Sequence, residues 1–212
     1  MNEEFKHRLS TALAATSPSR VKLDDARDAA VLIPIVAEPE PTLIFTIRTE
    51  TLPNHKGQIS FPGGSIDDTD PDEEAAALRE AQEEIGLDPG IVEVLGRLDA
   101  FPTFVTGFVV TPVIGWVENE PVLDPNPEEV ASVLHVPLAQ LNEEIRSEAG
   151  FSHRDRTYPT EAWVWNDNVI WGVTARIVRS FLAVVASAGL ADAPGETTSW
   201  TGWPMSGSSA AS

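Results

Sequence analysis

Three glutamates, Glu80, Glu83 and Glu84, lie in the closing turns of a predicted helix. At about 100° of rotation per residue, they fall on one face of the helix and project into a common space. Acids at a helix C-terminus each cost a few tenths to about 1 kcal/mol, because the helix dipole is already negative there, and they also repel one another. A bound cation is the simplest compensation. Since every ligand would be an oxygen atom, the pattern predicts Mg²⁺ or Mn²⁺.

Two simpler roles for these acids stay open at this point. They can be solvated side chains on an exposed helix, which is what most glutamate clusters are. Arg79 can pair with Glu83 one turn later, but one guanidinium does not neutralise three carboxylates.

The sequence also indicates where this helix begins and ends. Asp70 is a good N-cap, Pro71 suits the first helical position, and Glu73 completes a capping box with Asp70. Gly86 suits the left-handed position that follows a helix. The apolar side chains of the helix share one face: Leu78, Ala81 and Ile85.

The remaining elements are mostly short strands. Five segments are β-rich and bounded by proline or charge: 29–38, 41–50, 91–101, 107–117 and 128–138. Helices are expected in three further places, as a short surface helix before Ser17, around Ala139–Arg146, and over 171–189 where apolar residues recur every three or four positions. Residues 1–190 are therefore expected to form one domain. Residues 191–212 are small, polar and rich in Pro, Gly and Ser, which predicts a disordered tail, with docking of Trp200 and Trp203 left open.

Composition excludes several classes of protein. The 212 residues carry 14 Lys and Arg against 33 Asp and Glu, a formal net charge of -19, which argues against general binding to nucleic acid or anionic membrane. An anionic small substrate would then need a metal bridge. There is no cysteine, so disulfides, thiolate chemistry and cysteine-ligated zinc are excluded. The sequence has neither a signal-peptide pattern nor a run of roughly 18 apolar residues, so a cytoplasmic protein is expected.

Gly64 and the segment REAQEEIGL, residues 79–87, resemble the Nudix box, Gly-x5-Glu-x7-Arg-Glu-U-x-Glu-Glu-x-Gly-U, where U is apolar. The second half matches at every position. The first half departs, because Gly64 lies one residue farther from Arg79 than the signature expects and Pro71 holds the position of the first Glu. The resemblance implies an α/β Nudix fold, a mixed β-sheet sandwiched between α-helices, with a loop-helix-loop whose acidic face binds the divalent cations that hold a diphosphate.

Roles for individual residues follow from the same resemblance. It implies Glu80 and Glu84 as direct metal ligands with Glu83 sharing, and the Gly64 carbonyl is a further candidate ligand. Of these acids, Glu80 and Glu83 are expected to be catalytic as well as metal-binding. Arg79 would orient the acids through a salt bridge. The proton acceptor comes either from the box or from a downstream loop, where Glu129 is the candidate and Glu128 and Glu120 are its rivals.

The substrate is indicated by residues upstream of the box. Residues 44–64, IFTIRTETLPNHKGQISFPGG, resemble LLTxRSxxxRxxxGxxxFPGG, a motif of the coenzyme A pyrophosphatase subgroup, although Pro53 replaces its central Arg. This implies hydrolysis of coenzyme A or its thioesters to 3',5'-ADP and 4'-phosphopantetheine or its acyl form. The candidate substrate-binding residues are Arg48, His55, Lys56, Gly63 and Gly64.

Several alternatives remain. The substrate can instead be ADP-ribose, a dinucleoside polyphosphate or an oxidised nucleotide, and a non-catalytic nucleotide-binding Nudix module is a third candidate. Phe101, Phe104 and Phe108 can line an adenine or pantetheine groove, or at least two of them belong to the core. The sequence leaves a homodimer open.

Overall fold

A computed structural model of the chain describes residues 2–21, 23, 25–49, 57–103, 107–147, 150–153, 156–159 and 161–195. In segments 150–153 and 156–159 only the backbone is described. His55 and Lys56 lie outside these residues, and so does the predicted tail beyond residue 195, with Trp200 and Trp203.

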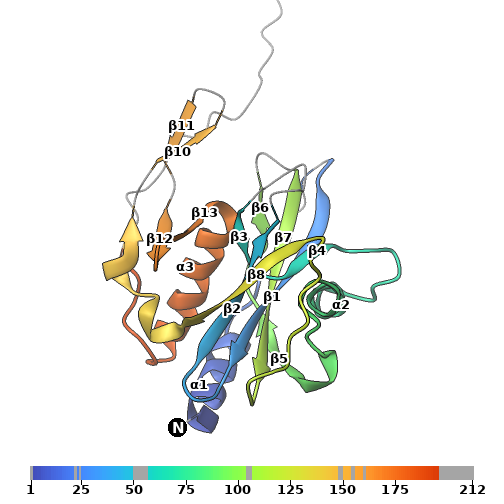
Figure 1. Cartoon of the computed structure of the whole chain (residues 1–212). Helices are drawn as coiled ribbons and strands as arrows, with labels where there is room; N and C mark the ends of the chain where they lie inside the picture. The colour runs from blue at the N-terminus through green and yellow to red at the C-terminus, as the bar shows by residue number, and fades with distance from the viewer. Residues whose placement is uncertain are drawn as a thin grey trace, which may run out of the picture.

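The described residues form a mixed sheet of eight strands (Figure 1). In chain order these are β1 (Arg27–Val36), β2 (Thr42–Arg48), β3 (Ile59–Ser60), β4 (Gly63–Ser65), β5 (Val92–Arg97), β6 (Phe101–Pro102), β7 (Phe108–Val117) and β8 (Val130–Pro137). The path β3-β2-β1-β7-β5 forms the body of the sheet, while β4, β6 and β8 pair with β1, β7 and β2. Strands β1 and β7 run parallel over their whole length, and the other pairs are antiparallel. All five predicted strands are therefore present.

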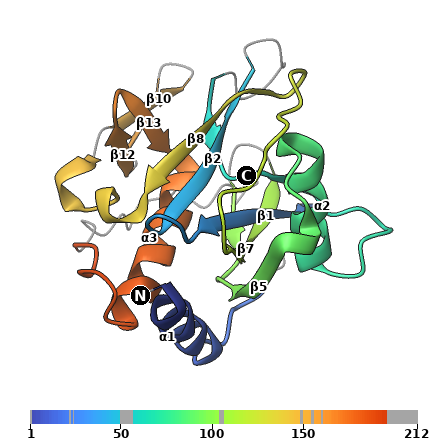
Figure 2. The same ribbon diagram turned by 60° about the horizontal axis from the view of Figure 1, so that its bottom comes forward.

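Helices cover both faces of this sheet, as Figures 1 and 2 show. Helix α2 (Glu73–Ile85) packs on one face, and α1 (Asn2–Ala14) and α3 (Gly172–Ser187) pack on the other. Strand β1 is apolar on both sides, because Leu32 joins the core under α2 while Ile33 joins the core under α1 and α3. The predicted α/β class, with a mixed sheet between helices, is confirmed. Within the described residues, none of the helices has the length and apolar character that crossing a membrane would require.

The predicted helix over Ala139–Arg146 is wrong. This segment holds two short 3-10 turns, Leu138–Gln140 and Glu143–Ile145, and then enters strand β9 (Arg146–Ser147). The Asn142 side chain accepts a hydrogen bond from the backbone N–H of Glu144 at 2.9 Å, so it starts a new turn instead of continuing the previous one.

A region absent from the sequence predictions follows. Strand β9 pairs with β12 (Ala162–Trp165), which pairs with β13 (Asn168–Trp171), and β10 (Gly150–His153) pairs with β11 (Arg156–Pro159). The turn between β12 and β13 has positive φ at both Asn166 and Asp167, at 45° and 66°. Asn and Asp tolerate that conformation. The pair Asn166 and Asp167 between two short apolar runs could therefore have predicted a β-hairpin.

Candidate active site

Helix α2 begins two residues later than predicted. Asp72, not Asp70, is its N-cap, and the Asp72 side chain accepts from the backbone N–H of Ala75 at 2.8 Å. The prediction failed because either aspartate can cap a helix, while the carboxylate of Asp70 is held elsewhere. At the other end Gly86 has φ of 68° in the left-handed region, and its N–H donates to the Gln82 carbonyl at 3.0 Å, as expected.

Small apolar side chains hold α2 close to the sheet. Ala76, Ala77, Ala81 and Ile85 are each at most 1% exposed and pack into the core that includes Leu32 of β1. Because this face is fixed by burial, the direction of the neighbouring glutamates is fixed as well. The sheet therefore sets the orientation of the acidic face.

Arg79 stands at the centre of the acidic cluster. Its Nε donates to Asp70 Oδ1 at 3.0 Å, and its Nη2 donates to Asp70 Oδ2 at 2.9 Å and to the Ser65 carbonyl at 3.0 Å. Its Nη1 donates to Glu80 at 3.0 Å and to Glu83 at 2.9 Å, so the predicted pair with Glu83 is confirmed. The hydrogen bond from Arg79 lowers the pKa of Asp70. One guanidinium thus joins the loop before α2 to two acids on the helix.

Glu84 is buried at the other side of the cluster, where it is 3% exposed. The backbone N–H of Gly63 donates to its Oε2 at 3.2 Å, and Nη1 of Arg48 lies 3.4 Å from its Oε1. Burial raises the pKa of Glu84 to about 7, against the lowering effect of Arg48 and of the Gly63 N–H. A carboxyl group in this position is incompletely neutralised by its protein partners, so it favours a proton or a further cation.

Gly64 allows Glu80 to lie against strand β4. A Cβ atom built on Gly64 would meet Oε2 of Glu80 at 2.5 Å, closer than any ordinary contact. Burial raises the pKa of Glu80, and the hydrogen bond from Arg79 opposes that shift. The absence of a side chain at position 64 therefore leaves the space that the Glu80 carboxylate occupies.

The segment before β8 is joined to the end of α2. The backbone N–H groups of Asp124 and Asn126 donate to the carbonyls of Ile85 and Glu84, each at 2.9 Å. The Glu129 N–H then donates to the Asn126 carbonyl at 3.1 Å. These bonds satisfy helix carbonyls that would otherwise lack a partner, and they bring the loop that carries Glu129 to the acidic cluster.

The charge of Glu129 acts on the box acids. After burial and the positive partners, it is one of the smaller causes that raise the pKa values of both Glu80 and Glu84. Its two rivals are placed differently. The Glu128 side chain is exposed, and Glu120 lies 3.3 Å from His135. Of the three, Glu129 is the one whose charge raises the pKa values of both the half-buried Glu80 and the buried Glu84.

Comparison with known proteins gives the family. A model of the NUDIX domain matches residues 26–159, more than half of the chain. The chain belongs to the Nudix family. It is 44% identical over 154 residues to a Cronobacter sakazakii protein named uncharacterized Nudix hydrolase NudL, covering 72% of this chain and 80% of that one. A Klebsiella pneumoniae protein of the same name is 43% identical over 169 residues, covering 79% and 86%.

A solved structure has the same fold. The MutT/nudix family protein from Enterococcus faecalis aligns with a TM-score of 0.56 at 15% identity, over 87% of this chain and 74% of that one.

The structure of this chain also shows what stands at the position where its sequence differs from the first half of the Nudix box. Pro71 holds the position of the signature's first Glu, and Asp70 beside it supplies the carboxylate that binds Arg79.

Nudix hydrolases generally need divalent metal ions. Within the described residues, no group of three His, Cys, Asp or Glu side chains is arranged to hold one. The predicted common space is therefore not seen, because Glu80 and Glu83 turn to Arg79 while Glu84 turns to Gly63 and Arg48. The donor chemistry nevertheless fits a hard cation. Glu80, Glu83 and Glu84 offer only oxygen atoms, and the pKa of Glu84 is raised by burial that a bound cation would offset.

Arg48 has a contact that the sequence did not predict. The upstream motif marks it as a substrate-binding residue, and in the structure it contacts Glu84 of the Nudix box. The residue that follows, Thr49, donates its N–H to the Glu129 carbonyl at 3.0 Å. The end of β2 is thus bonded to both the box and the downstream loop.

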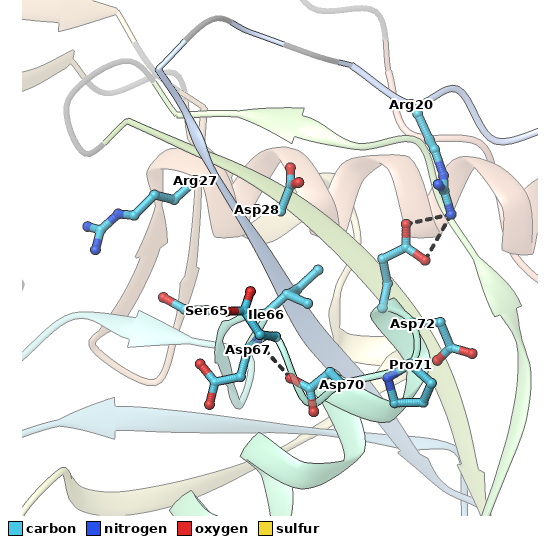
Figure 3. A pocket seen from close by; sticks show the side chains of 11 residues that line it. Arg20, Arg27, Asp28, Ser65, Ile66, Asp67, Asp70, Pro71 and Asp72 are labelled. Atoms are coloured by element: carbon cyan, nitrogen blue, oxygen red, sulfur yellow. Dashed lines mark hydrogen bonds and ion pairs between the residues drawn. The ribbon is translucent and has the colours of Figure 1, made fainter.

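A cavity of about 480 Å³ opens beside the start of α2 (Figure 3). Arg20 and Arg27 stand on opposite sides of it, and Arg20 lies 2.7 Å from Glu73. The rest of its lining comes from Asp28 and from residues 65–68 and 70–73. None of the three box glutamates is among these described lining residues.

Proposed function

We propose that the chain hydrolyses the diphosphate linkage of coenzyme A or its thioesters. The products would be 3',5'-ADP and 4'-phosphopantetheine or its acyl form. Membership of the Nudix family supports the coarser statement, hydrolysis of a diphosphate substrate. The finer statement rests on the likeness of residues 44–64 to the motif of the coenzyme A pyrophosphatase subgroup.

The observation that carries this proposal is the contact between Arg48 and Glu84. Arg48 belongs to the upstream motif and Glu84 to the Nudix box, and their charged atoms lie 3.4 Å apart. Gly63, at the end of the same motif, donates its N–H to Glu84. Two residues of the upstream motif, Arg48 and Gly63, therefore contact one of the proposed metal-binding acids, and this supports a role for the motif in selecting the substrate.

Each acidic residue has a proposed task. Glu80, Glu83 and Glu84 would hold the divalent ion, which when bound would neutralise charge on the diphosphate and lower the pKa of a water molecule. Arg79 keeps Glu80 and Glu83 together, and Asp70 fixes the position of Arg79. These contacts orient carboxylates that repel one another.

Glu129 is proposed as the proton acceptor for the attacking water. Its loop is bonded to the end of α2, and its charge reaches Glu80 and Glu84. A general base has to lie within hydrogen-bond reach of the proton that it removes, which favours an acid on this loop over Glu120. Arg48 and Gly63 would place the substrate beside Glu84, and His55 and Lys56 remain candidate substrate contacts.

Product analysis tests the proposal. The chain is incubated with Mg²⁺ or Mn²⁺ and, in separate reactions, coenzyme A, acetyl-coenzyme A, ADP-ribose, a dinucleoside polyphosphate and an oxidised nucleoside triphosphate, and products are identified by mass spectrometry. Release of 3',5'-ADP and phosphopantetheine with the highest kcat/KM supports it. A preference for another diphosphate would show that coenzyme A is not the substrate, although the chain would still be a diphosphate hydrolase. Binding without cleavage of any compound would point to a non-catalytic module.

A further inference from the structure

Asn126 lies in the loop between β7 and β8, and three successive backbone N–H groups donate to it. The N–H of Glu128 donates to the side-chain oxygen of Asn126, Oδ1, at 3.1 Å. The N–H groups of Glu129 and Val130 donate to its main-chain carbonyl at 3.1 Å and 2.8 Å. Asn126 therefore caps a single turn that contains the proposed proton acceptor.

The sequence of this segment, Asn-Pro-Glu-Glu, suits such a turn. Asn is among the best residues at a cap position, because its side chain can accept from an N–H two residues later. Pro127 follows directly and fits the first position of a helical turn, where an N–H would have no partner within the turn. The next two acids differ in burial, since Glu128 is exposed and Glu129 is partly buried. The conformation of the turn thus decides which acid faces the protein.

The N–H of Asn126 itself reaches the Nudix box. It donates to the main-chain carbonyl of Glu84, at the end of α2, at 2.9 Å. Figures 1 and 2 both show the yellow-green segment before β8 passing this end of the helix. Gly86 makes the approach possible, because a Cβ atom there would lie 2.9 Å from the backbone nitrogen of Asp124. Asn126 is therefore bonded to the backbone of a proposed metal ligand on one side and of the proposed base on the other.

Thr49 holds the opposite side of the same turn. It donates its N–H to the Glu129 carbonyl at 3.0 Å and its hydroxyl to the Glu128 carbonyl at 3.1 Å. Thr49 thus binds the carbonyl groups of the two glutamates, whereas Asn126 binds their N–H groups. Loss of the Asn126 side chain would release one N–H group and leave the loop attached to both β2 and α2. The side chain is therefore expected to set the conformation of the turn, not the attachment of the loop.

We propose that Asn126 is a positioning residue for hydrolysis, an inference that rests on the proposed function. By accepting the Glu128 N–H, its side chain holds the turn in the conformation that directs the Glu129 carboxylate toward the proposed metal site. A general base works only within hydrogen-bond reach of the water that it deprotonates, and a misplacement of about 1 Å can cost about 100-fold in rate. Asn126 touches neither the metal nor the substrate in this proposal, and it acts through Glu129.

A double-mutant cycle with Glu129 tests the assignment. With coenzyme A and Mg²⁺, Asn126→Ala is expected to lower kcat about 100-fold while KM changes by less than about twofold, because the base is misplaced but the substrate contacts remain. In the Glu129→Gln background the same substitution should change kcat by less than about twofold, since no base is left to position. Asn126→Ser should restore most of the activity, because its hydroxyl can accept the same N–H.

Asn142→Ala is the matched control. Asn142 caps the 3-10 turn Glu143–Ile145 in the same way, and its side-chain hydrogen bonds are to Ala139 and Glu144, outside the acidic cluster. Each Ala variant loses one cap, so both should lower Tm by a similar amount, but kcat should fall only in Asn126→Ala. An equal fall in kcat in both variants would show a general effect of losing a cap and would overturn the assignment.

Amide hydrogen exchange of the metal-free chain, followed by NMR, gives a readout that does not depend on activity. Exchange at Glu128 and Glu129 should be faster in Asn126→Ala than in the wild type, and close to the wild type in Asn126→Ser, because local opening of the turn exposes these N–H groups. Unchanged exchange in Asn126→Ala would show that the side chain does not hold the turn, and the inference would be overturned.

The outcomes separate this inference from the proposed function. If coenzyme A is hydrolysed and Asn126→Ala lowers kcat equally in both backgrounds, or not at all, the positioning role is overturned while the proposed function stands. If another diphosphate is hydrolysed instead, the proposed substrate is wrong, and the same cycle measured with that compound supports or overturns the role of Asn126 by the same criteria. If none of the compounds is hydrolysed, both proposals fail.

Discussion

Asp70 and Arg79 are joined by two hydrogen bonds, Nε to Oδ1 at 3.0 Å and Nη2 to Oδ2 at 2.9 Å. Asp70 belongs to the loop before α2, and Arg79 lies in the middle of the helix, so this pair fixes the loop against the helix. Because Nη1 of the same guanidinium holds Glu80 and Glu83, the pair also determines where those acids lie.

Asp70→Asn should destabilise the chain by about 1–3 kcal/mol at pH 7, the usual cost of losing a charged hydrogen-bond partner. The pKa of Asp70 is lowered in the folded state, so its contribution is present above its unfolded pKa of about 3.9 and is lost as the pH falls through the folded value. Urea denaturation at several pH values would measure the difference between variant and wild type, which should be constant from pH 6 to 8 and shrink below about pH 4. Asp68→Asn, an exposed change in the same loop, is the control. If Asp68→Asn lost as much unfolding free energy as Asp70→Asn, the role of the Asp70–Arg79 pair would be contradicted.

Gly64→Ala should reduce activity far more than stability. The added Cβ would lie 2.5 Å from the Glu80 carboxylate, so Glu80 has to move while the rest of α2 can stay in place. A displacement of about 1 Å in a catalytic group can cost about 100-fold in rate, and we expect a loss of that order in kcat/KM. Thermal unfolding followed by circular dichroism should show a small change in Tm. A variant with normal kcat/KM would show that the position of Glu80 is not critical.

Much of the fold could be predicted because its determinants are local. The apolar runs of β1 and β7 are long and bounded by charge or proline, and α2 has a helical apolar face that ends at Gly86. The pair Arg79 and Glu83 also follows from helical spacing alone, since residues four apart are neighbours.

The geometry of the site depends on contacts between distant segments, which the spacing within one helix cannot show. Glu84 turns away from Glu83 because the N–H of Gly63 and the guanidinium of Arg48 lie on its other side, and both are brought there by strand pairing. The choice of Asp72 over Asp70 as N-cap likewise depends on where Arg79 reaches. Both residues are aspartates, so their types gave no reason to prefer one.

Glu84→Gln should stabilise the metal-free chain at high pH. The folded pKa of Glu84 is raised to about 7 from 4.5, so the favourable contribution of its protonated form is complete below about pH 4.5 and is lost as the pH rises through 7. At pH 8 the ionised wild type therefore carries a penalty on the order of 3 kcal/mol that the amide avoids. Thermal unfolding in the presence of a chelator should give the variant a higher Tm than the wild type at pH 8 but not at pH 5.

Added Mn²⁺ should make the wild type more stable than Glu84→Gln at pH 8, the reverse of the order without metal. If Glu84 is a ligand, the wild type gains stability with metal concentration and the variant gains much less, because a ligand that binds the folded state stabilises it by mass action. The same variant should lose hydrolysis. An equal gain in Tm with Mn²⁺, or unchanged turnover, would refute Glu84 as a metal ligand.

Glu129→Gln should lower kcat by about 100-fold to 10,000-fold with little change in KM, the effect expected when a general base is removed. The side-chain amide keeps the size of the residue, and the backbone bonds from Thr49 to the Glu129 carbonyl and from Glu129 to Asn126 are unaffected, so the loop should stay attached to α2. Glu128→Gln provides a matched control one residue away, with an exposed side chain and the same change in charge. If both variants are as active as the wild type, neither Glu128 nor Glu129 is the proton acceptor, which leaves Glu120 and the box glutamates.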